Sequence, residues 1–233
     1  MSGARRPRVA VVVFPGSNCD RDAMAAVEVA GGEAVPVWHA SHDLGGCAAV
    51  ILPGGFSYGD YLRAGAMAAH SPVMQAVRRH AADGGAVLGI CNGFQILLEV
   101  GLLPGAMLMN RTLRFICREV FLRVERTDVP MLRHLRKGKV LRLPIAHKEG
   151  NWFAEPDVVD WLESQGAVAL RYCDEDGRPG EEVNPNGALN DVAGLVNADG
   201  NVLGMMPHPE RRVGSLLGGS DGLGIIRGLV EVA

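Results

Sequence analysis

Short apolar runs alternate with segments of helical periodicity along the first hundred residues. Residues 9–13, 34–38, 48–52 and 86–90 are mostly apolar and rich in valine and alanine, which predicts buried strands. Residues 20–30 and 73–82 carry charged and small residues at helical spacing, and a Gly-Gly pair soon follows each segment, as expected where a helix ends. Residues 92–100 predict a further helix. This βαβ alternation is typical of a doubly wound, mainly parallel sheet.

The second half of the chain has more β character. Residues 118–125 and 140–146 alternate as strands do, residues 168–172, 192–196 and 202–206 continue the pattern, and residues 223–230 predict a last helix. No repeat or low-complexity linker divides the sequence, and the turn-rich residues 177–187 are interpreted as a surface loop. We therefore expect one domain over residues 1–233, an open α/β sheet flanked by helices with extra β structure in the second half.

Composition narrows the classes of function. A net charge of -3 gives no global field that would attract nucleic acid or an anionic membrane, so neither partner is expected. No apolar run reaches the ~20 residues of a membrane span, and we expect a cytoplasmic protein with reduced thiols. The cysteines are odd in number and widely spaced, which argues against a disulfide framework and a structural zinc site: Cys19, Cys47, Cys91, Cys117 and Cys173. His39 and His42 lack further ligands, so no metal is expected.

The strongest chemical signal is the segment GICNG at residues 89–93, which lies between a predicted strand and a predicted helix. A Gly-x-nucleophile-x-Gly turn holds its nucleophile in a strained conformation, and glycines are needed where side chains would clash. Cys91 would lie at a helix N-terminus, where the dipole favours a thiolate. The N–H of Asn92 would point to where an oxyanion forms.

Two further segments supply the partners that a cysteine nucleophile needs. In MPHPE at residues 206–210, His208 and Glu210 are two apart in an extended chain, so Glu210 can orient the imidazole. In PGGF at residues 53–56, the absence of side chains at Gly54 and Gly55 would let a backbone N–H reach a substrate carbonyl. All three segments follow predicted strands, at the edge where open α/β sheets place their sites.

Together these segments resemble the class I (triad) glutamine amidotransferase family, whose fold is flavodoxin-like. The branch that supplies the glutaminase subunit of phosphoribosylformylglycinamidine synthase is similar to this chain in further blocks, which run from near the first residue to the last helix. Those blocks are FPGSNCD (14–20), PGGFSYGDYLRAGA (53–66), GICNGFQIL (89–97), PIAHKEG (144–150), NPNG (184–187) and MMPHPER (206–211). One departure is Lys148, where the family usually has glycine, which leaves the local loop shape open.

The resemblance implies a role for each matched residue. Cys91 would attack the glutamine carboxamide to form a thioester, while His208 moves the protons and Glu210 orients His208. Backbone N–H groups of Gly55 and Asn92 would form the oxyanion hole. Gly54, Gln95 and His147 are the candidates for contact with the substrate, and the loop at residues 56–66, with His147, would form a rim that faces a partner subunit.

The sequence lacks a GxxxxGK[ST] loop and a GxGxxG fingerprint. The resemblance therefore implies that ATP and Mg²⁺ are used by a separate synthetase subunit, with a small third subunit, to convert formylglycinamide ribonucleotide to formylglycinamidine ribonucleotide in de novo purine biosynthesis. No cofactor is expected in this chain. Three alternatives stay open: an amidotransferase subunit of another pathway, an elbow-cysteine hydrolase or chaperone on a similar fold, and a catalytically silent regulatory subunit. The hydrolases and chaperones usually lack a His-x-Glu segment after a late strand.

Overall fold

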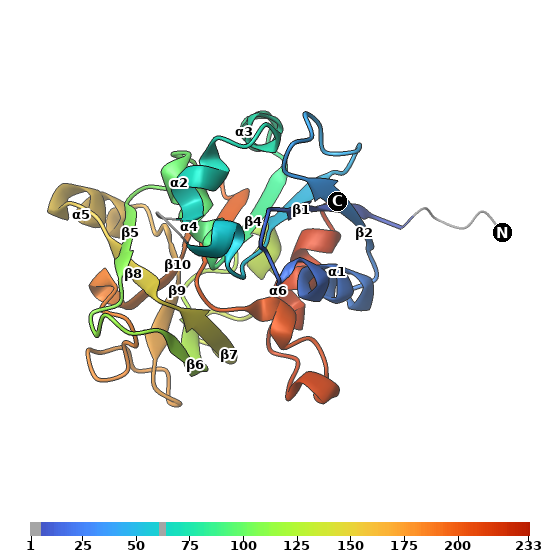
Figure 1. The fold of residues 1–233 in the computed structure, drawn as a ribbon. Helices are drawn as coiled ribbons and strands as arrows, with labels where there is room; N and C mark the ends of the chain where they lie inside the picture. The colour runs from blue at the N-terminus through green and yellow to red at the C-terminus, as the bar shows by residue number, and fades with distance from the viewer. Residues whose placement is uncertain (1–5, 61–63) are drawn as a thin grey trace.

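A nine-stranded sheet forms the centre of the structure, a computed structural model that describes residues 6–60 and 64–233 (Figure 1). The strands follow one another across this sheet in the order β2 (Glu33–Trp38), β1 (Arg8–Val13), β3 (Ala49–Leu52), β4 (Ala86–Ile90), β11 (Val202–Met205), β10 (Val192–Val196), β9 (Val168–Cys173), β6 (Ile116–Val124) and β7 (Val140–His147). A separate two-stranded sheet pairs β5 (Ala106–Met109) with β8 (Glu149–Phe153).

The direction of the strands explains where a site can form. From β2 to β11 neighbouring strands are parallel, and from β11 to β7 they are antiparallel. Four successive antiparallel pairings return β7 to the direction of β11. The carboxyl ends of β3, β4, β11 and β7 therefore lie at the same edge of the sheet, which is where ligands bind in open α/β folds.

Four helices cover the parallel half of the sheet: α1 (Asp20–Val29), α3 (Val73–Ala82), α4 (Asn92–Glu99) and α6 (Leu223–Val230). Two further helices are α2 (Ala64–Ala69) and α5 (Pro156–Ser164), and α5 lies beside the small β5–β8 sheet (Figure 1). The connection from β1 to β2, which contains α1, and the connection from β3 to β4, which contains α3, run in opposite directions across the sheet. Because such connections are right-handed, α1 and α3 lie on opposite faces. Helix α6 packs beside α1, whereas α2 packs on α4 (Figure 1). The longest described helices, α1 and α3, have ten residues each, and no described helix could cross a membrane.

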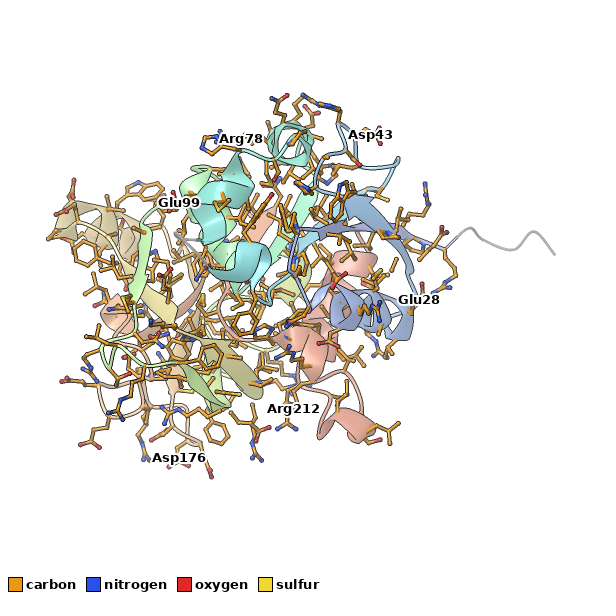
Figure 2. All side chains as sticks on the ribbon, viewed as in Figure 1. Glu28, Asp43, Arg78, Glu99, Asp176 and Arg212 are labelled. Atoms are coloured by element: carbon orange, nitrogen blue, oxygen red, sulfur yellow. The ribbon has the colours of Figure 1, made fainter. Side chains whose placement is uncertain are left out.

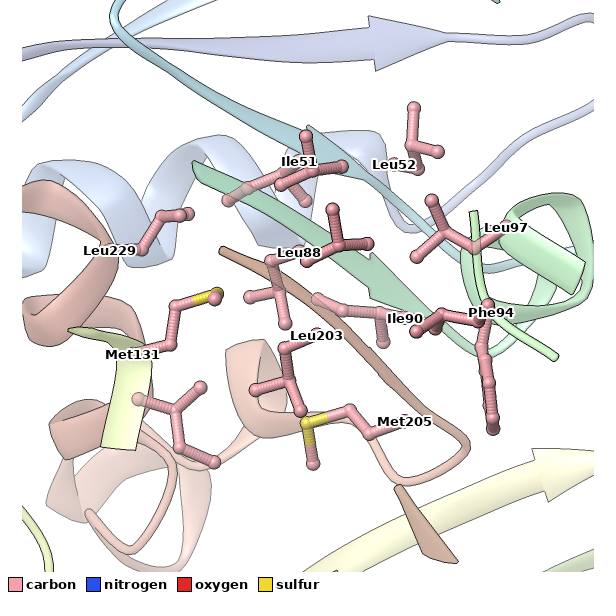
Figure 3. Packing of buried hydrophobic residues seen from close by; sticks show 14 of the residues in the cluster. Ile51, Leu52, Leu88, Ile90, Phe94, Leu97, Met131, Leu203, Met205 and Leu229 are labelled. Atoms are coloured by element: carbon pink, nitrogen blue, oxygen red, sulfur yellow. The ribbon is translucent and has the colours of Figure 1, made fainter. Parts of the chain in front are cut away.

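The core lies between the central strands and these helices. Strands β3 and β4 are buried along their whole length, because helices cover both faces, and this is why their sequences are continuous apolar runs. Each fully buried leucine or isoleucine contributes roughly 1.5–3 kcal/mol. Figure 3 shows how strand and helix side chains interdigitate at the centre, among them Ile51, Leu88, Ile90, Phe94, Leu97, Leu203 and Met205. Charged side chains such as Glu28, Asp43, Arg78 and Asp176 lie around the periphery (Figure 2).

The predicted open α/β sheet flanked by helices is confirmed, and the extra β structure of the second half extends the same sheet. Each predicted strand and helix is present, with ends that differ by at most two residues. Four elements were missed: α2, α5, β5 and β8. Helix α2 is six residues of alanine, glycine and methionine without a polar face, and β5 and β8 are short strands outside the main sheet. Short elements of this kind carry little periodicity.

Candidate active site

The segment between β4 and α4 forms the predicted elbow. Cys91 caps α4 and has φ 51° and ψ -106°, a conformation that a non-glycine residue adopts only under strain. A side chain at Gly93 would overlap the Leu52 carbonyl, and one at Gly89 would lie 2.8 Å from the carbonyl carbon of Gly93. The glycines on either side of Cys91 are therefore required by close packing of the backbone, and Cys91 itself is buried.

His208 and Glu210 form a buried ion pair just beyond β11. Nδ1 of His208 lies 2.6 Å from Oε1 of Glu210, and both side chains are about 1% exposed or less. Burial alone would lower the pKa of His208, but the Glu210 carboxylate, helped by the nearby thiols of Cys19 and Cys91, raises that pKa well above its ordinary value. Nε2 of His208 makes no hydrogen bond with a described residue, so it is available to exchange a proton.

Gly54 lies between the nucleophile and the base. A side-chain carbon built on Gly54 would lie 2.9 Å from Cys91 Cβ and 2.9 Å from His208 Cε1. The predicted approach of the PGG turn, the elbow and the His-x-Glu segment is therefore present in the structure. Gly54 does not line the cleft described below, so the structure gives it a role in close packing, and its predicted contact with substrate stays a prediction.

The predicted oxyanion donors are the N–H of Asn92, next to Cys91 in the chain, and the N–H of Gly55, next to the Gly54 that packs against Cys91. Gly55 has φ 88°, which favours glycine, and its N–H bonds to no described residue. Asn92 is the first residue of α4, where backbone N–H groups point away from the helix. Its side chain is used for support: Oδ1 accepts a hydrogen bond from the N–H of Ser57 at 3.2 Å, and Nδ2 donates to Gln95 Oε1 at 2.9 Å.

A cleft of about 190 Å³ opens beside Cys91. This volume is below the ~300–1,000 Å³ of pockets for drug-sized ligands, so it is suited to a molecule the size of an amino acid. Gln95, predicted to contact substrate, lines the cleft, and its Nε2 donates to the Glu149 carbonyl at 2.8 Å. The rings of Phe56 and Phe115 stack at 5.9 Å and form part of the wall. The other residues of the lining are Gly59, Cys91, Asn92, Ala146, His147, Lys148 and Glu149.

His147 ends β7 and is also part of this lining. Nδ2 of Asn110 donates to the carbonyls of Arg114 and His147, so Oδ1 of Asn110 must accept from Nδ1 of His147, 3.0 Å away. Burial, together with the charge of His208, lowers the pKa of His147 to about 4. His147 is thus a neutral imidazole protonated on Nδ1, and its predicted contact with substrate stays a prediction. Lys148 also reaches the cleft, where the family usually has glycine.

Cys19 was not linked to this site by the sequence pattern. Its sulfur lies 2.9 Å from Nη2 of Arg211, and it lies within 4.8 Å of a His208 ring nitrogen and a Glu210 carboxylate oxygen. Cys19, His208 and Glu210 are the only such group among the described residues that is close enough to hold a metal ion. The Arg211 guanidinium next to the sulfur and the His208–Glu210 ion pair make this arrangement unfavourable for a cation.

The loop at residues 56–66, predicted to face a partner, is described only in part. Residues 61–63 lie outside the described residues. Phe56, Tyr58 and Gly59 all have positive φ, and the Tyr58 hydroxyl lies 3.0 Å from His39 Nδ1 and 2.8 Å from Ser71 Oγ. Phe115 was missed because no local motif marks it. Cys19 lies in the FPGSNCD block, but nothing in the local sequence shows that this block reaches His208. The FPGS turn itself could have been recognised from its composition.

The elbow-cysteine hydrolases and chaperones considered above carry their cysteine on a similar sheet but usually do not pair it with a His-x-Glu segment after a late strand. The buried His208–Glu210 pair, facing Cys91 across Gly54, favours a triad enzyme over those proteins and over a silent module. Fold and site together define a class I glutamine amidotransferase.

Comparison with known proteins narrows the class. Residues 6–217 match the family model of the CobB/CobQ-like glutamine amidotransferase domain. Phosphoribosylformylglycinamidine synthase subunit PurQ of a Thermus thermophilus strain is 58% identical over 96% of this chain and 98% of its own length, and that of Gloeobacter violaceus is 55% identical over 97% and 98%. A chain in the structure of PurLQS from Thermotoga maritima is 44% identical, with a TM-score of 0.85, over 97% of this chain and 98% of its own. The chain belongs to the PurQ family of phosphoribosylformylglycinamidine synthase subunits.

Proposed function

We propose that this chain hydrolyses glutamine to glutamate and ammonia at Cys91 and delivers the ammonia to a synthetase subunit, which uses it to convert formylglycinamide ribonucleotide to formylglycinamidine ribonucleotide in de novo purine biosynthesis. The observation that carries the proposal is the approach of Cys91 and the buried His208–Glu210 pair on either side of Gly54. The relatives in the PurQ family are named as subunits of the synthase that catalyses this conversion.

The geometry supports a thioester mechanism. The Cys91 thiolate attacks the carboxamide carbon, and the N–H groups of Gly55 and Asn92 bind the oxyanion. His208 gives a proton to the leaving ammonia, and the Glu210 carboxylate, which raises the pKa of His208, favours the protonated form that this step needs. His208 then takes a proton from water as the water attacks the thioester, and glutamate is released. Glu210 orients the imidazole and stabilises its charge throughout.

The partners and compartment follow from the same proposal. A chain related to this one is part of the PurLQS complex of Thermotoga maritima, and we assign this chain the same kind of assembly, with a synthetase subunit and a small third subunit. ATP and Mg²⁺ are used by the synthetase. Neutral water protonates most free ammonia and makes it a poor nucleophile, so transfer within a complex is chemically favoured. We place the complex in the cytoplasm, where the cysteines stay reduced.

The test uses the Cys91→Ala variant in the assembled complex. It should form no thioester and hydrolyse no glutamine, yet the complex should still make product when a high concentration of ammonium salt replaces glutamine. Glutamine hydrolysis at more than a few per cent of the wild-type rate would contradict the role of Cys91. Failure with ammonium salt, in a complex shown to be assembled, would mean that this chain does more than supply nitrogen. If the wild-type complex transferred ammonia to a different acceptor and not to formylglycinamide ribonucleotide, the chain would belong to another pathway.

A further inference from the structure

Apart from Cys19, the residues of the FPGSNCD segment have no role in the chemistry of the proposed mechanism, although the segment lies next to the catalytic centre. Its first four residues form a tight turn: the N–H of Ser17 bonds to the Phe14 carbonyl at 3.1 Å, and Gly16 has φ 79°. Proline followed by a glycine of this φ is the signature of a type II turn. The turn ends at Ser17, whose hydroxyl faces Gly54.

This turn and the next residue, Asn18, bond at three places to residues 54–58, the segment that contains the predicted oxyanion donor Gly55. The Ser17 hydroxyl donates to the Gly54 carbonyl at 3.0 Å, and the N–H of Asn18 donates to the Gly55 carbonyl at 3.0 Å. The Pro15 carbonyl accepts a hydrogen bond from the N–H of Tyr58 at 2.6 Å. Of these three contacts, only the one from Ser17 is made by a side chain, so it is the one that a substitution can remove.

The contact from Ser17 determines the direction of an N–H group. A trans peptide is planar, so its C=O and N–H point in opposite directions. The carbonyl of Gly54 and the N–H of Gly55 belong to the same peptide, and the carbonyl is held toward Ser17. The N–H of Gly55 is therefore directed away from the FPGS turn, and no described residue accepts its hydrogen bond.

Gly54 and Gly55 are packed against different parts of the protein. A side chain at Gly55 would contact the FPGSNCD segment, 2.7 Å from the Cys19 sulfur, whereas one at Gly54 would contact Cys91 and His208. The turn is thus packed between the FPGSNCD segment and the catalytic residues. We propose that Ser17 is a positioning residue whose hydroxyl holds the Gly54 carbonyl, so that the N–H of Gly55 stays aimed at the oxyanion. This inference rests on the proposed glutaminase function.

The experiment compares Ser17→Thr with Ser17→Val in the assembled complex, because these two side chains have nearly the same shape and only threonine keeps the hydroxyl. Glutaminase kcat and KM are measured with the synthetase holding its nucleotide and acceptor. Ser17→Val should lower kcat by on the order of 10²-fold, the loss seen when one oxyanion donor is removed. KM should change little, because the oxyanion forms only when Cys91 attacks the carboxamide and is absent while glutamine is merely bound. Ser17→Thr should keep most of the activity.

A second measurement separates this effect from damage to the nucleophile. Iodoacetamide alkylates Cys91 by forming a C–S bond as iodide leaves, and no oxyanion is formed. Its rate with Cys91 should be the same in Ser17→Val as in the wild type. Ser41→Ala is the matched control: Ser41 is also a half-buried loop serine, but its hydroxyl bonds to no described residue, so all rates should match the wild type.

Three results would overturn the inference. Ser17→Val with a wild-type kcat would show that the hydroxyl is not needed. An equal fall in glutamine hydrolysis and in alkylation by iodoacetamide would place the effect on Cys91 or on the fold. A raised KM with unchanged kcat would indicate a binding role.

The same experiment separates failure of the proposed function from failure of this inference. A wild-type complex that hydrolyses no glutamine would overturn both. An active wild type with an equally active Ser17→Val would overturn the inference alone.

Discussion

At the scale of single residues, the protonation of His208 depends on its neighbours more than on its burial. A buried imidazole ordinarily loses its proton, but the Glu210 carboxylate at 2.6 Å reverses the balance and raises the pKa of His208. In the proposed mechanism, the residue that transfers protons and the residue that raises its pKa are therefore different groups. Substitutions of the two should have effects of different size and kind.

We expect Glu210→Gln to be milder than His208→Ala. Loss of the imidazole removes proton transfer, which is worth about 10²–10⁴ in rate. Loss of the carboxylate only weakens the orientation and charge of the imidazole, so the fall in rate should be smaller by about tenfold or more. Glu210→Gln should also lower the pKa of His208. Activity that needs the His208 proton is lost as pH rises through that pKa, so the basic limb of the kcat profile should move to lower pH. A more damaging Glu210→Gln, with the fold preserved, would contradict these roles.

At the scale of elements, the elbow depends on close contact between β3 and α4. The backbone of Gly93 approaches the Leu52 carbonyl so closely that a single methyl group would overlap it. Backbone atoms cannot move aside as a flexible side chain can, so strand and helix would have to separate. The strained conformation of Cys91 is maintained by this packing.

We predict that Gly93→Ala destabilises the protein by about 1–3 kcal/mol, the usual cost of overpacking, and lowers glutaminase activity through displacement of Cys91. Urea denaturation at neutral pH measures the free energy of unfolding. Gly180→Ala is the control, because a side chain there would meet nothing within 4 Å. Equal stability of the two variants would mean that the contact with Leu52 is easily relaxed.

The end of β7 should give the protein a pH-dependent stability. The pKa of His147 is lowered from 6.5 to about 4, which corresponds to about 3 kcal/mol. Between those pH values the unfolded chain binds the proton more tightly, so the contribution of His147 falls as pH decreases from 6.5 toward 4. As pH decreases from neutral to the lowered pKa, the wild type should lose about 3 kcal/mol more stability than His147→Gln. Parallel stability curves for the two proteins would contradict this.

At the scale of the whole molecule, glutamine hydrolysis and the use of ammonia are assigned to different chains. A glutaminase that worked at full rate alone would consume glutamine without making product. The segment that follows Gly55 is suited to respond to a partner, because Phe56, Tyr58 and Gly59 have positive φ and two of these residues line the cleft. Positive φ in non-glycine residues is strained and persists only with support from neighbours.

We therefore predict that the isolated chain is a poor glutaminase and that the synthetase accelerates it by on the order of 10²-fold, the value of one oxyanion donor. Turnover of glutamine is measured for the chain alone and with the purified synthetase, with and without nucleotide and acceptor. Equal rates in all three conditions would remove the claim of coupling. Acceleration by the synthetase without nucleotide or acceptor would assign the effect to docking itself.

The sequence by itself predicted most of the helices and strands and named the candidate triad. Continuous apolar runs predicted β3 and β4 because strands covered on both faces need apolar side chains at every position. The elbow at Cys91 and the spacing of His208 and Glu210 are local, so their geometry follows from a few adjacent residues.

Contacts between distant segments were decided only by the tertiary structure. Ser17 reaches Gly54 because β1 pairs with β3, and Cys19 reaches His208 because α1 packs on the segment that follows β11. His147 reaches the cleft because four antiparallel pairings return β7 to the direction of β11. Periodicity reports which face of an element is buried, whereas the partner that buries it depends on strand order, and strand order is a property of the whole fold.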